Sequence, residues 1–451
     1  MLSAQNTQED WLDSIPQIYP FINEAALSIQ NANALRPFYD KLRALDKGER
    51  WQVRIAHIGD SHVQADYFPS TLRKRLQHRF GNAGRGLVFY YKQADTHGPL
   101  DYRTKSTVEW SNRRRIFQKN GPPIGISGMG IATPSKTFEL QYFAREEGKI
   151  DRITLFHNVS SQAYQYTLRD LQSMETVQTP MTLDWASYTV ANGDTLFDLA
   201  RRFGCSVQEL QKWNKLPNAI LQIGQILSVR RERLPDKLPF SRSGHLSTSM
   251  VNLPQPISHF SIHGESTGKS TAAAQVFGAL LEDTQSPGVL YNMMGVNGAT
   301  FYHFDRAEQF NEQLAMLDPD LILITLGTNE ALQKGFDPKR VEQQIHAYLT
   351  RLKANLPEAQ FLIIANPDVL MGRKTSNPQI EMTKVILEKA AQQYGMAFWD
   401  LYDLMGGKGS IRSWQAAELA NRDFIHFTKK GYILLGHLLH RAIMEQLHAG
   451  N

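Results

Sequence analysis

Long apolar runs alternate with amphipathic stretches in two separate parts of the chain. One run, at 51–60, is followed by an amphipathic stretch at 67–80, and the alternation resumes after residue 288. Apolar runs of this length predict strands buried on both faces, and apolar spacings of three and four predict helices. The pattern therefore predicts one α/β domain with a parallel sheet covered by helices on both faces. Further strands are expected at 288–296, 320–327, 359–366 and 396–400, and further helices at 20–48, 304–317, 338–355, 377–394 and 428–448.

The part of the chain between these two blocks has a different pattern. From about 90 to 180, short β-like runs such as 137–144 are separated by turn residues at intervals of roughly ten positions. Similar runs, including 257–264, follow a charged, proline-bearing linker at 230–239. This pattern predicts a β-sandwich that interrupts the α/β domain and is itself interrupted by a short helical unit at 187–229. The α/β domain is assigned to 1–95 and 288–451, the β-sandwich to 96–185 and 231–287, and the helical unit to 186–230.

Composition narrows the class of protein without identifying it. The 451 residues include 49 Lys and Arg and 44 Asp and Glu, a net charge of only +5, and we find no long basic block that would indicate nucleic-acid binding. No apolar run approaches the roughly 18 residues that a membrane-spanning helix needs. The single cysteine, Cys205, excludes an internal disulfide and a thiolate zinc site. We expect Cys205 to pack as a small apolar residue.

Ser61 is the first candidate for chemistry, because it directly follows the apolar run at 51–60. Ligands of open α/β sheets bind at the carboxyl ends of the strands, where a serine at the turn into a helix can be exposed. The backbone N–H groups at the start of that helix favour a developing oxyanion. The alternative is that Ser61 only caps the helix, since Ser and Asp are common at this position.

Four further residues carry side chains or backbone groups that suit the same chemistry. Asp423 and His426 are three residues apart, so the carboxylate can orient the imidazole as a general base for a serine hydroxyl, although a surface turn is the simpler interpretation. Asn329 follows the strand at 320–327 and can donate to an oxyanion. Gly298 follows the strand at 288–296 and lets its backbone N–H approach a ligand. Both of these could instead be turn residues.

Together these motifs resemble the SGNH (GDSL-type) hydrolase family. The matching blocks are Gly59–Ser61, Gly298, Gly327–Asn329 and Asp423–His426, in the family's order. The resemblance implies a three-layer, flavodoxin-like α/β/α fold, here interrupted by the β-sandwich. It implies Ser61 as nucleophile, His426 as base and Asp423 as its orienting carboxylate. It also implies an oxyanion hole made by the backbone N–H groups of Ser61 and Gly298 and the side chain of Asn329.

Two residues depart from the common family pattern. His62 stands where a leucine usually follows the serine, and Glu330 where an aspartate commonly follows the asparagine. GDSH variants resemble the subgroup that acts on O-acetylated bacterial polysaccharides, including peptidoglycan O-acetylesterases with an inserted β-sandwich. Asp60 and His62 are taken as supporting residues, and His62 either shapes the acyl pocket or packs passively. No HExxH pattern occurs, so we expect neither a metal nor another cofactor.

The helical unit at 187–229 resembles a LysM module. Its GDTL turn, Asn214 and LQIGQIL segment match the family, which implies a βααβ fold that binds N-acetylglucosamine-containing glycans such as peptidoglycan or chitin. The alternative is a structural spacer within the insertion. Aromatic residues of the β-sandwich (Trp110, Tyr142, Tyr164 and Tyr166) could stack on sugars but are more often core residues. The family's binding groove maps to Gly193, Asp194, Thr195, Leu216, Pro217, Asn218, Ala219 and Ile220.

The combined resemblance predicts a serine esterase that removes O-acetyl groups from peptidoglycan and is held on the polymer by LysM. The alternatives are an acetylesterase of another polysaccharide such as xylan or xyloglucan, a polysaccharide O-acetyltransferase, and a cell-wall-binding protein without catalysis. Peptidoglycan lies outside the cytoplasm, so we expect a periplasmic or cell-surface location. Residues 1–13 are polar and lack the apolar region of a signal peptide, which we therefore expect to be missing from this sequence.

Overall fold

The computed structural model divides the chain into two compact units. The large unit comprises Met1–Leu168 and Pro239–Asn451, and the small unit comprises Arg169–Leu238. Cys205, whose packing was predicted above, lies outside the described residues. The structure describes residues 15–146, 148–158, 163–171, 185–191, 193–202, 207–218, 220–230, 238–239, 241–242, 247–268, 271–307 and 309–449.

A five-stranded parallel sheet forms the centre of the large unit. Its spatial order is β16-β1-β17-β18-β21, so the first strand in the chain lies between the second and the third. Ligands bind such sheets where the chain switches direction, which here is at the carboxyl ends of β1 and β17. Gly59 pairs with Thr325 at these ends, so the two strands finish level with each other. The strands are β1 (Gln52–Gly59), β16 (Gly288–Gly295), β17 (Leu321–Thr325), β18 (Gln360–Ile364) and β21 (Ala397–Trp399).

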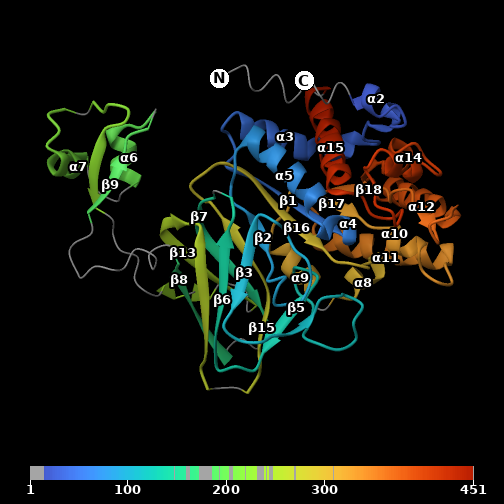
Figure 1. Cartoon of the computed structure of the whole chain (residues 1–451), viewed down its shortest axis with the longest axis horizontal. Helices are drawn as coiled ribbons and strands as arrows, with labels where there is room; N and C mark the ends of the chain where they lie inside the picture. Colours follow the sequence, from blue (N-terminus) through green and yellow to red (C-terminus); the bar gives the residue numbers. More distant parts are fainter. Residues whose placement is uncertain are drawn as a thin grey trace. The chain divides into compact units, whose positions relative to one another are not determined.

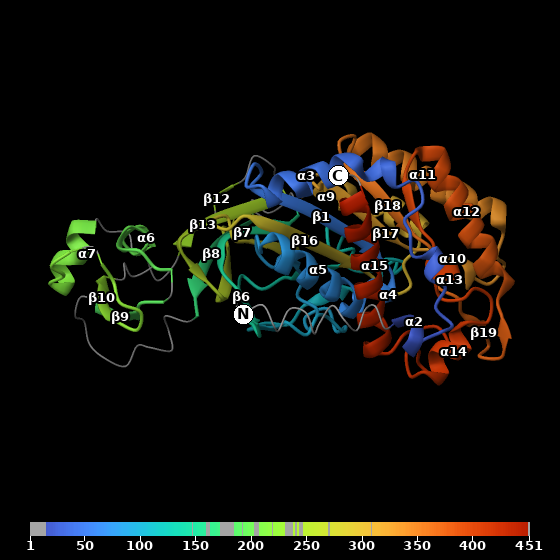
Figure 2. The same cartoon turned by 90° about the horizontal axis from the view of Figure 1, so that it is seen from above.

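Helices cover both faces of this sheet, as the sequence predicts (Figures 1 and 2). On one face α3 (Arg36–Asp46), α5 (Tyr67–Phe80) and α15 (Lys429–Ala449) pack together, with α5 directly on β16. The other face carries α8 (Phe301–Asp305), α11 (Pro338–Asn355) and α12 (Pro378–Tyr394). The apolar strands are therefore buried on both sides.

A buried histidine links the three strands that meet beneath the site. His57 of β1 is fully buried, and its Nδ1 lies 2.6 Å from the hydroxyl of Tyr291 on β16. Its Nε2 lies 2.8 Å from Thr325 Oγ1 on β17. Burial lowers the pKa of His57 to about 3, so the ring is neutral. Because both ring nitrogens have partners, this polar side chain joins the strands without an unsatisfied group.

Two antiparallel sheets, here called the inserted sheets, lie between β1 and β16 in the chain (Figure 1). The rings of His157 and Tyr166 stack across them with centroids 5.3 Å apart. Gly86–Val88 (β2), assigned to the α/β domain from the sequence, pairs with β15 of the inserted sheets. One sheet contains β3 (Tyr102–Ser106), β6 (Thr137–Ala144), β8 (Tyr164–Asp170), β11 (Leu238–Pro239) and β14 (His259–Ser266); the other contains β2, β4 (Ser111–Arg113), β5 (Gly130–Thr133), β7 (Ile150–His157), β12 (Ser241–Arg242), β13 (Thr248–Ile257) and β15 (Ala274–Glu282).

The aromatic residues considered for sugar stacking belong mainly to the core of these sheets. Tyr142, Tyr164 and Tyr166 are all buried. Trp110 is half-buried, and its ring lies edge-on to Phe138 while its Nε1 donates to Ser106 Oγ at 2.8 Å. The core interpretation therefore applies to the three tyrosines.

The predicted helix at 20–48 is wrong over its first part. Between residue 20 and α3 the described chain forms two short 3₁₀ turns, Glu24–Ala26 and Ala32–Leu35. Asn31 between them has φ of 49°, a left-handed conformation that ends a right-handed helix. Helix α3 then begins beside Pro37, which suits the first turn of a helix but not its interior. Apolar spacing alone could not show this break.

Two other predicted elements are also divided in the structure. The helix expected at 304–317 is replaced by α8 and α9 (Phe310–Ala315). The strand expected at 257–264 spans the boundary between β13 and β14 at Ser258. In both places the apolar pattern continues across a short turn, so it does not mark where the backbone changes direction.

The small unit has the predicted βααβ order. Strands β9 (Trp185–Thr189) and β10 (Ile226–Arg230) pair antiparallel around α6 (Leu196–Arg202) and α7 (Val207–Asn214). Asn214 ties α7 to β10, since its Nδ2 donates to Ser228 O at 2.8 Å. A separate apolar core forms from Val190, Leu196, Leu199, Ala200, Leu210, Leu227 and Val229.

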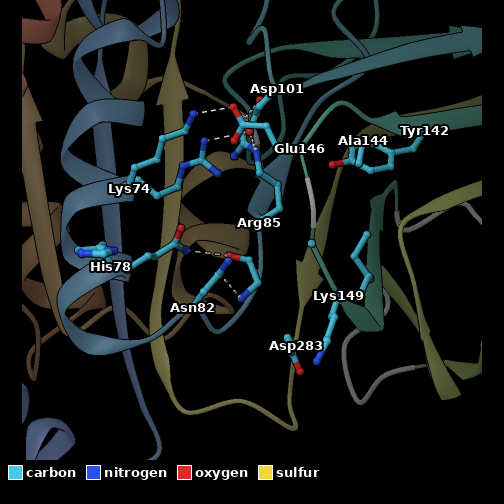
Figure 3. Close-up of a pocket in the computed structure, with 15 residues that line it drawn as sticks. Lys74, His78, Asn82, Arg85, Asp101, Tyr142, Ala144, Glu146, Lys149 and Asp283 are labelled. Atoms are coloured by element: carbon cyan, nitrogen blue, oxygen red, sulfur yellow. Dashed lines mark hydrogen bonds and ion pairs between the residues drawn. The ribbon is translucent and has the colours of Figure 1, made fainter. Parts of the chain in front are cut away.

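A charged pocket of about 360 Å³ lies between α5 and the inserted sheets (Figure 3). At its inner end Arg73 Nη2 and Arg85 Nε approach Asp101 Oδ2 at 2.8 and 2.5 Å, and all three side chains are nearly buried. Burial favours a raised pKa for Asp101, but the two guanidinium groups outweigh it and hold the pKa of this carboxyl well below its ordinary value. At the open rim Lys74 and Glu146 form an ion pair that is about half-exposed.

Removing the buried carboxylate should therefore destabilise the large unit. We expect Asp101→Ala to lower the free energy of unfolding by about 3–5 kcal/mol, because it leaves two buried guanidinium groups without their main partner. The exposed pair provides the control, and Glu146→Ala should cost about 1 kcal/mol or less. Because the pKa of Asp101 is lowered on folding, its contribution is present above about pH 4 and declines as the pH falls further. Urea unfolding of both variants at several pH values tests this, and equal losses would contradict it.

Candidate active site

Ser61 begins a four-residue helix, α4 (Ser61–Gln64), directly after β1. The residue that caps this helix is Asp60, whose Oδ1 accepts from the backbone N–H of His62 at 2.9 Å. Asp60, and not Ser61, is therefore the residue that caps this helix. The hydroxyl of Ser61 is left for another partner.

The turn between β1 and α4 requires a small residue at its start. A Cβ on residue 59 would lie 2.2 Å from Val63 Cγ2 and 3.0 Å from the carbonyl oxygen of Thr325. Glycine at position 59 thus lets α4 fold back against the strand ends. This close packing holds Ser61 at the carboxyl edge of the sheet, beside β17.

The structure brings Ser61, His426 and Asp423 into one hydrogen-bonded chain, although 365 residues separate the first two in sequence. Ser61 Oγ lies 3.0 Å from His426 Nε2, and His426 Nδ1 lies 2.8 Å from Asp423 Oδ2. Although burial acts to raise the pKa of Asp423, hydrogen bonds from His426 and from the backbone outweigh it and lower that pKa. The carboxylate is therefore charged and oriented toward the imidazole at neutral pH.

Asp423 and His426 lie in one turn, whose shape depends on an unusual backbone conformation and on hydrogen bonds within the turn. Phe424 has φ of 56°, a left-handed value that is uncommon for a bulky residue. Asp423 Oδ1 accepts from the backbone N–H groups of Ile425 and His426 at 2.9 and 3.0 Å. One oxygen of the carboxylate thus holds the turn while the other holds the imidazole ring.

His62 packs behind His426 rather than facing an open acyl pocket. Its side chain is buried, and its ring centroid lies 5.5 Å from that of His426. Its Nδ1 lies 3.0 Å from the hydroxyl of Tyr432. Burial lowers the pKa of His62 to about 3, so it stays neutral beside the imidazole of His426. The geometry favours the packing interpretation of this residue.

Asn329 and Gly298 both follow strands of the parallel sheet and lie at its carboxyl edge, close to Ser61. Asn329 is in α10 (Thr328–Ala331), and its Nδ2 donates to Asp60 Oδ2 at 3.1 Å and to Ala299 O at 3.0 Å. Gly298 has φ of 75°, which favours glycine, and adjoins Ala299. The Asn329 amide therefore spans the turn that holds Ser61 and the loop that holds Gly298.

Two carboxyl groups are buried beneath these loops. Asp60 is 1% exposed, and Glu330 is fully buried with its Oε1 accepting from Phe301 N at 2.7 Å. Burial raises the pKa of each to about 7, and the charge of Glu330 adds to the shift of Asp60. Glu330 thus connects α10 to the start of α8, behind the loop that carries Gly298. The sequence marked Glu330 only as a departure from the family pattern.

Sequence reasoning missed Gln64, which organises the same edge. Its Oε1 accepts from the backbone N–H of Asn297 at 2.7 Å, and its Nε2 donates to Thr96 Oγ1 and to His97 O at 3.1 and 3.0 Å. Gln64 is almost fully buried. The only indication in the sequence was a polar residue one helical turn after Ser61. Its partners lie in loops whose approach to Gln64 cannot be predicted from the sequence.

In the small unit the proposed glycan-contact residues lie on the surface in two loops. Gly193–Thr195 precede α6, where Thr195 Oγ1 accepts from Asp198 N at 3.1 Å, so Thr195 caps the helix. Asp194 Oδ2 instead accepts from Ala191 N at 2.7 Å within the turn. Leu216, half-buried, begins the second loop, while Pro217, Asn218 and Ile220 are exposed. Ala219 lies outside the described residues.

The described residues offer no site that points to a metal. Within these ranges no group of three or more His, Cys, Asp or Glu side chains is arranged to hold a metal ion. Ser61, His426 and Asp423 have the order hydroxyl, imidazole, carboxylate that nucleophilic catalysis by a serine requires.

No helix in the described part of the chain is both long enough and apolar enough to cross a membrane.

Two family matches agree with this geometry. The GDSL-like lipase/acylhydrolase family matches residues 262–434, and the LysM domain matches residues 188–230. The first match includes Gly298, Asn329, Asp423 and His426 but not Ser61, because the insertion separates the serine from the rest of the domain. In the structure, Ser61 lies within hydrogen-bonding distance of His426.

A solved structure of a peptidoglycan O-acetylesterase has the same fold. It is 21% identical, with a TM-score of 0.65, and the alignment covers 93% of this chain and 99% of that chain. Local similarity also exists to the membrane-bound lytic murein transglycosylase D of Escherichia coli K12, 50% identical over 42 residues, and to the probable endopeptidase p60 of Listeria seeligeri, 34% identical over 53 residues. These matches cover 9% and 12% of this chain, and this chain spans only 9% and 10% of those two proteins.

The chain therefore contains a domain that matches the GDSL-like lipase/acylhydrolase family and has the SGNH hydrolase fold, together with a LysM domain.

Proposed function

We propose that the protein removes O-acetyl groups from peptidoglycan, with the large unit as the esterase and the LysM domain as its anchor on the polymer. The observation that carries the esterase part is the hydrogen-bonded chain from Ser61 Oγ through His426 to Asp423. A serine hydroxyl is a weak nucleophile until a base takes its proton, and this chain supplies that base with its orienting carboxylate.

The reaction follows from the positions of these three side chains. Ser61 Oγ attacks the acetyl carbonyl carbon while its proton passes to His426 Nε2, and Asp423 stabilises the imidazolium through Nδ1. The imidazolium then protonates the sugar oxygen as the C–O bond breaks, leaving an acetyl group on Ser61. Water, deprotonated by His426, attacks this acetyl-enzyme and releases acetate. The serine recovers its proton from the imidazolium.

The oxyanion of each tetrahedral intermediate would be held by the N–H groups of Ser61 and Gly298 and by the Asn329 amide. Both hydrogens of Asn329 Nδ2 are directed at other groups here, one at Asp60 and one at Ala299. The substrate oxygen must therefore share or replace one of these bonds. The stronger charge of an oxyanion, compared with a neutral carbonyl, favours this exchange in the transition state.

The choice of peptidoglycan as substrate is supported by the combination of domains. A LysM domain in the same chain would raise the local concentration of polymer around the esterase site by tethering. The fold shared with a peptidoglycan O-acetylesterase over 93% of the chain is consistent with this substrate. A protein that acts on this polymer would work in the periplasm or at the cell surface.

Loss of the nucleophile or the base should abolish ester hydrolysis. We expect Ser61→Ala and His426→Ala each to lower kcat by about 10⁴-fold or more, because each removes the covalent route. Acetate release from purified O-acetylated peptidoglycan measures this, with acetylated xylan as the competing substrate. Ser70→Ala, in α5 of the same unit, is the matched control. Full activity in Ser61→Ala would rule out the proposed mechanism, and a preference for xylan would rule out the proposed substrate.

The amide of Asn329 should act on catalysis rather than on folding. We expect Asn329→Ala to lower kcat by about 10²–10³-fold with little change in KM, since one oxyanion donor is lost. Thermal unfolding of the same variant separates this effect from a loss of structure. Asn252→Ala, on β13 among the inserted sheets, serves as the control. An Asn329→Ala enzyme that is unstable yet retains the wild-type kcat would show that the amide only holds the loops together.

The LysM domain should affect polymer binding but not the chemistry. We expect deletion of residues 187–229 to reduce co-sedimentation with peptidoglycan and to raise KM on the insoluble polymer by about tenfold or more, because the tether is lost. Hydrolysis of p-nitrophenyl acetate should be unaffected, since the small unit has its own core. Unchanged co-sedimentation after the deletion would assign LysM a purely structural role.

A further inference from the structure

An exposed row of aromatic side chains lies beside the loop that carries Gly298. The rings of Phe117, His303 and Tyr302 follow one another with centroids 5.7 and 5.8 Å apart. Phe117 is 45% exposed and Tyr302 is 43% exposed. Large apolar side chains gathered at a surface, rather than scattered singly, indicate an interaction site.

This aromatic row ends in a guanidinium group on each side. Arg115 lies over the ring of Phe117 at 5.9 Å, and Arg306 lies over the ring of Tyr302 at 5.6 Å. Both arginine side chains belong to exposed residues. We call the set Arg115, Phe117, His303, Tyr302 and Arg306 the aromatic ledge. Tyr and Arg are the residues that dominate binding energy at recognition surfaces.

The ledge touches the proposed oxyanion loop directly. A Cβ on residue 298 would lie 2.7 Å from Phe117 Cε1, so the phenyl ring covers the position of the missing side chain. The two neighbours of Gly298 are bonded to the site, because Asn297 N donates to Gln64 and Ala299 O accepts from Asn329. A molecule lying on the ledge therefore extends away from the oxyanion hole.

The two halves of the ledge come from different parts of the large unit. Phe117 and Arg115 lie between β4 and β5 of the inserted sheets, whereas Tyr302, His303 and Arg306 lie in or just after α8. The ledge exists only when the inserted sheets pack against the α/β part of the unit. An esterase of small esters alone would have no need of it.

We propose that the aromatic ledge binds the glycan strand next to the acetylated sugar, and that its two arginines select strands carrying acidic peptide stems. This rests on the proposed esterase function. Sugar rings present apolar C–H faces that can pack on flat aromatic rings, while the polar tip of a tyrosine can form hydrogen bonds. Peptide stems end in carboxylates, which guanidinium groups bind in bidentate pairs. A neutral polysaccharide would use the rings but not the arginines.

The test compares two soluble substrates on the full chain. One consists of O-acetylated glycan strands with their peptide stems, and the other of the same strands after the stems are removed enzymatically. The rate on p-nitrophenyl acetate normalises each variant for any disturbance of the site. The measured quantity is kcat/KM on the strands divided by kcat/KM on this small ester.

We expect Phe117→Ala and Tyr302→Ala each to lower this ratio by about tenfold on both kinds of strand, mainly through KM. Phe117→Tyr, which keeps the ring, should restore it. Phe143→Ala is the matched control, because Phe143 also lies under an arginine, Arg103 at 4.8 Å, but on the inserted sheets away from Gly298. A loss in the ledge variants no larger than that in Phe143→Ala would overturn the ledge.

We expect the double variant Arg115→Ala with Arg306→Ala to lower the ratio several-fold on strands with stems and much less on stripped strands. At about 1 M salt, where the Debye length falls to about 3 Å, this difference should largely vanish. An equal loss on both kinds of strand would overturn the role of the acidic stems. A wild-type chain inactive on every ester would instead refute the esterase function itself, so the two failures are distinguishable.

Discussion

The geometry of the site depends on the buried carboxylate of Asp60. One oxygen caps α4 through the backbone N–H of His62, and the other accepts from the amide of Asn329. Because Asp60 supplies the cap, the hydroxyl of Ser61 is not needed for helix formation and can face His426. Because the same group holds Asn329, one side chain positions both Ser61, the proposed nucleophile, and Asn329, the proposed oxyanion donor. Its burial, which raises its pKa to about 7, removes it from bulk solvent and so strengthens both hydrogen bonds.

The residues of the hydrogen-bonded chain could be found from sequence because a parallel sheet imposes strong constraints. Apolar runs locate the strands, and side chains that follow parallel strands meet at one edge. Ser61 and Asn329 therefore converge although an insertion and a strand lie between them. The pairing of Asp423 with His426 required only a spacing of three residues, but the left-handed backbone of Phe424 that shapes their turn leaves no signal in the sequence.

The parts that could not be predicted depend on contacts between loops. Gln64 has an ordinary sequence context, and its importance comes from partners at Asn297, Thr96 and His97 that only the folded chain brings near. The same holds for the N-terminal segment, where a single left-handed residue, Asn31, interrupts a spacing that otherwise indicates a helix. Periodicity reports which residues are buried, but it does not report where the backbone turns.

The insertion adds a wall to the site that the sheet and its helices form. The chain leaves the sheet after β1, forms the inserted sheets and returns through β15 into β16, whose end leads to Gly298. Both ends of the insertion lie at the amino-terminal end of β16, where Asn82 bridges Val289, whereas loops within the insertion reach the opposite, carboxyl edge. Thr96 and His97 brace Gln64, while Phe117 covers Gly298. The sheet and its helices carry the proposed nucleophile, base and oxyanion donors, and the insertion forms the wall beside them. Substitutions in that wall can therefore alter the surface beside Gly298 while the hydrogen-bonded chain from Ser61 to Asp423 stays in place.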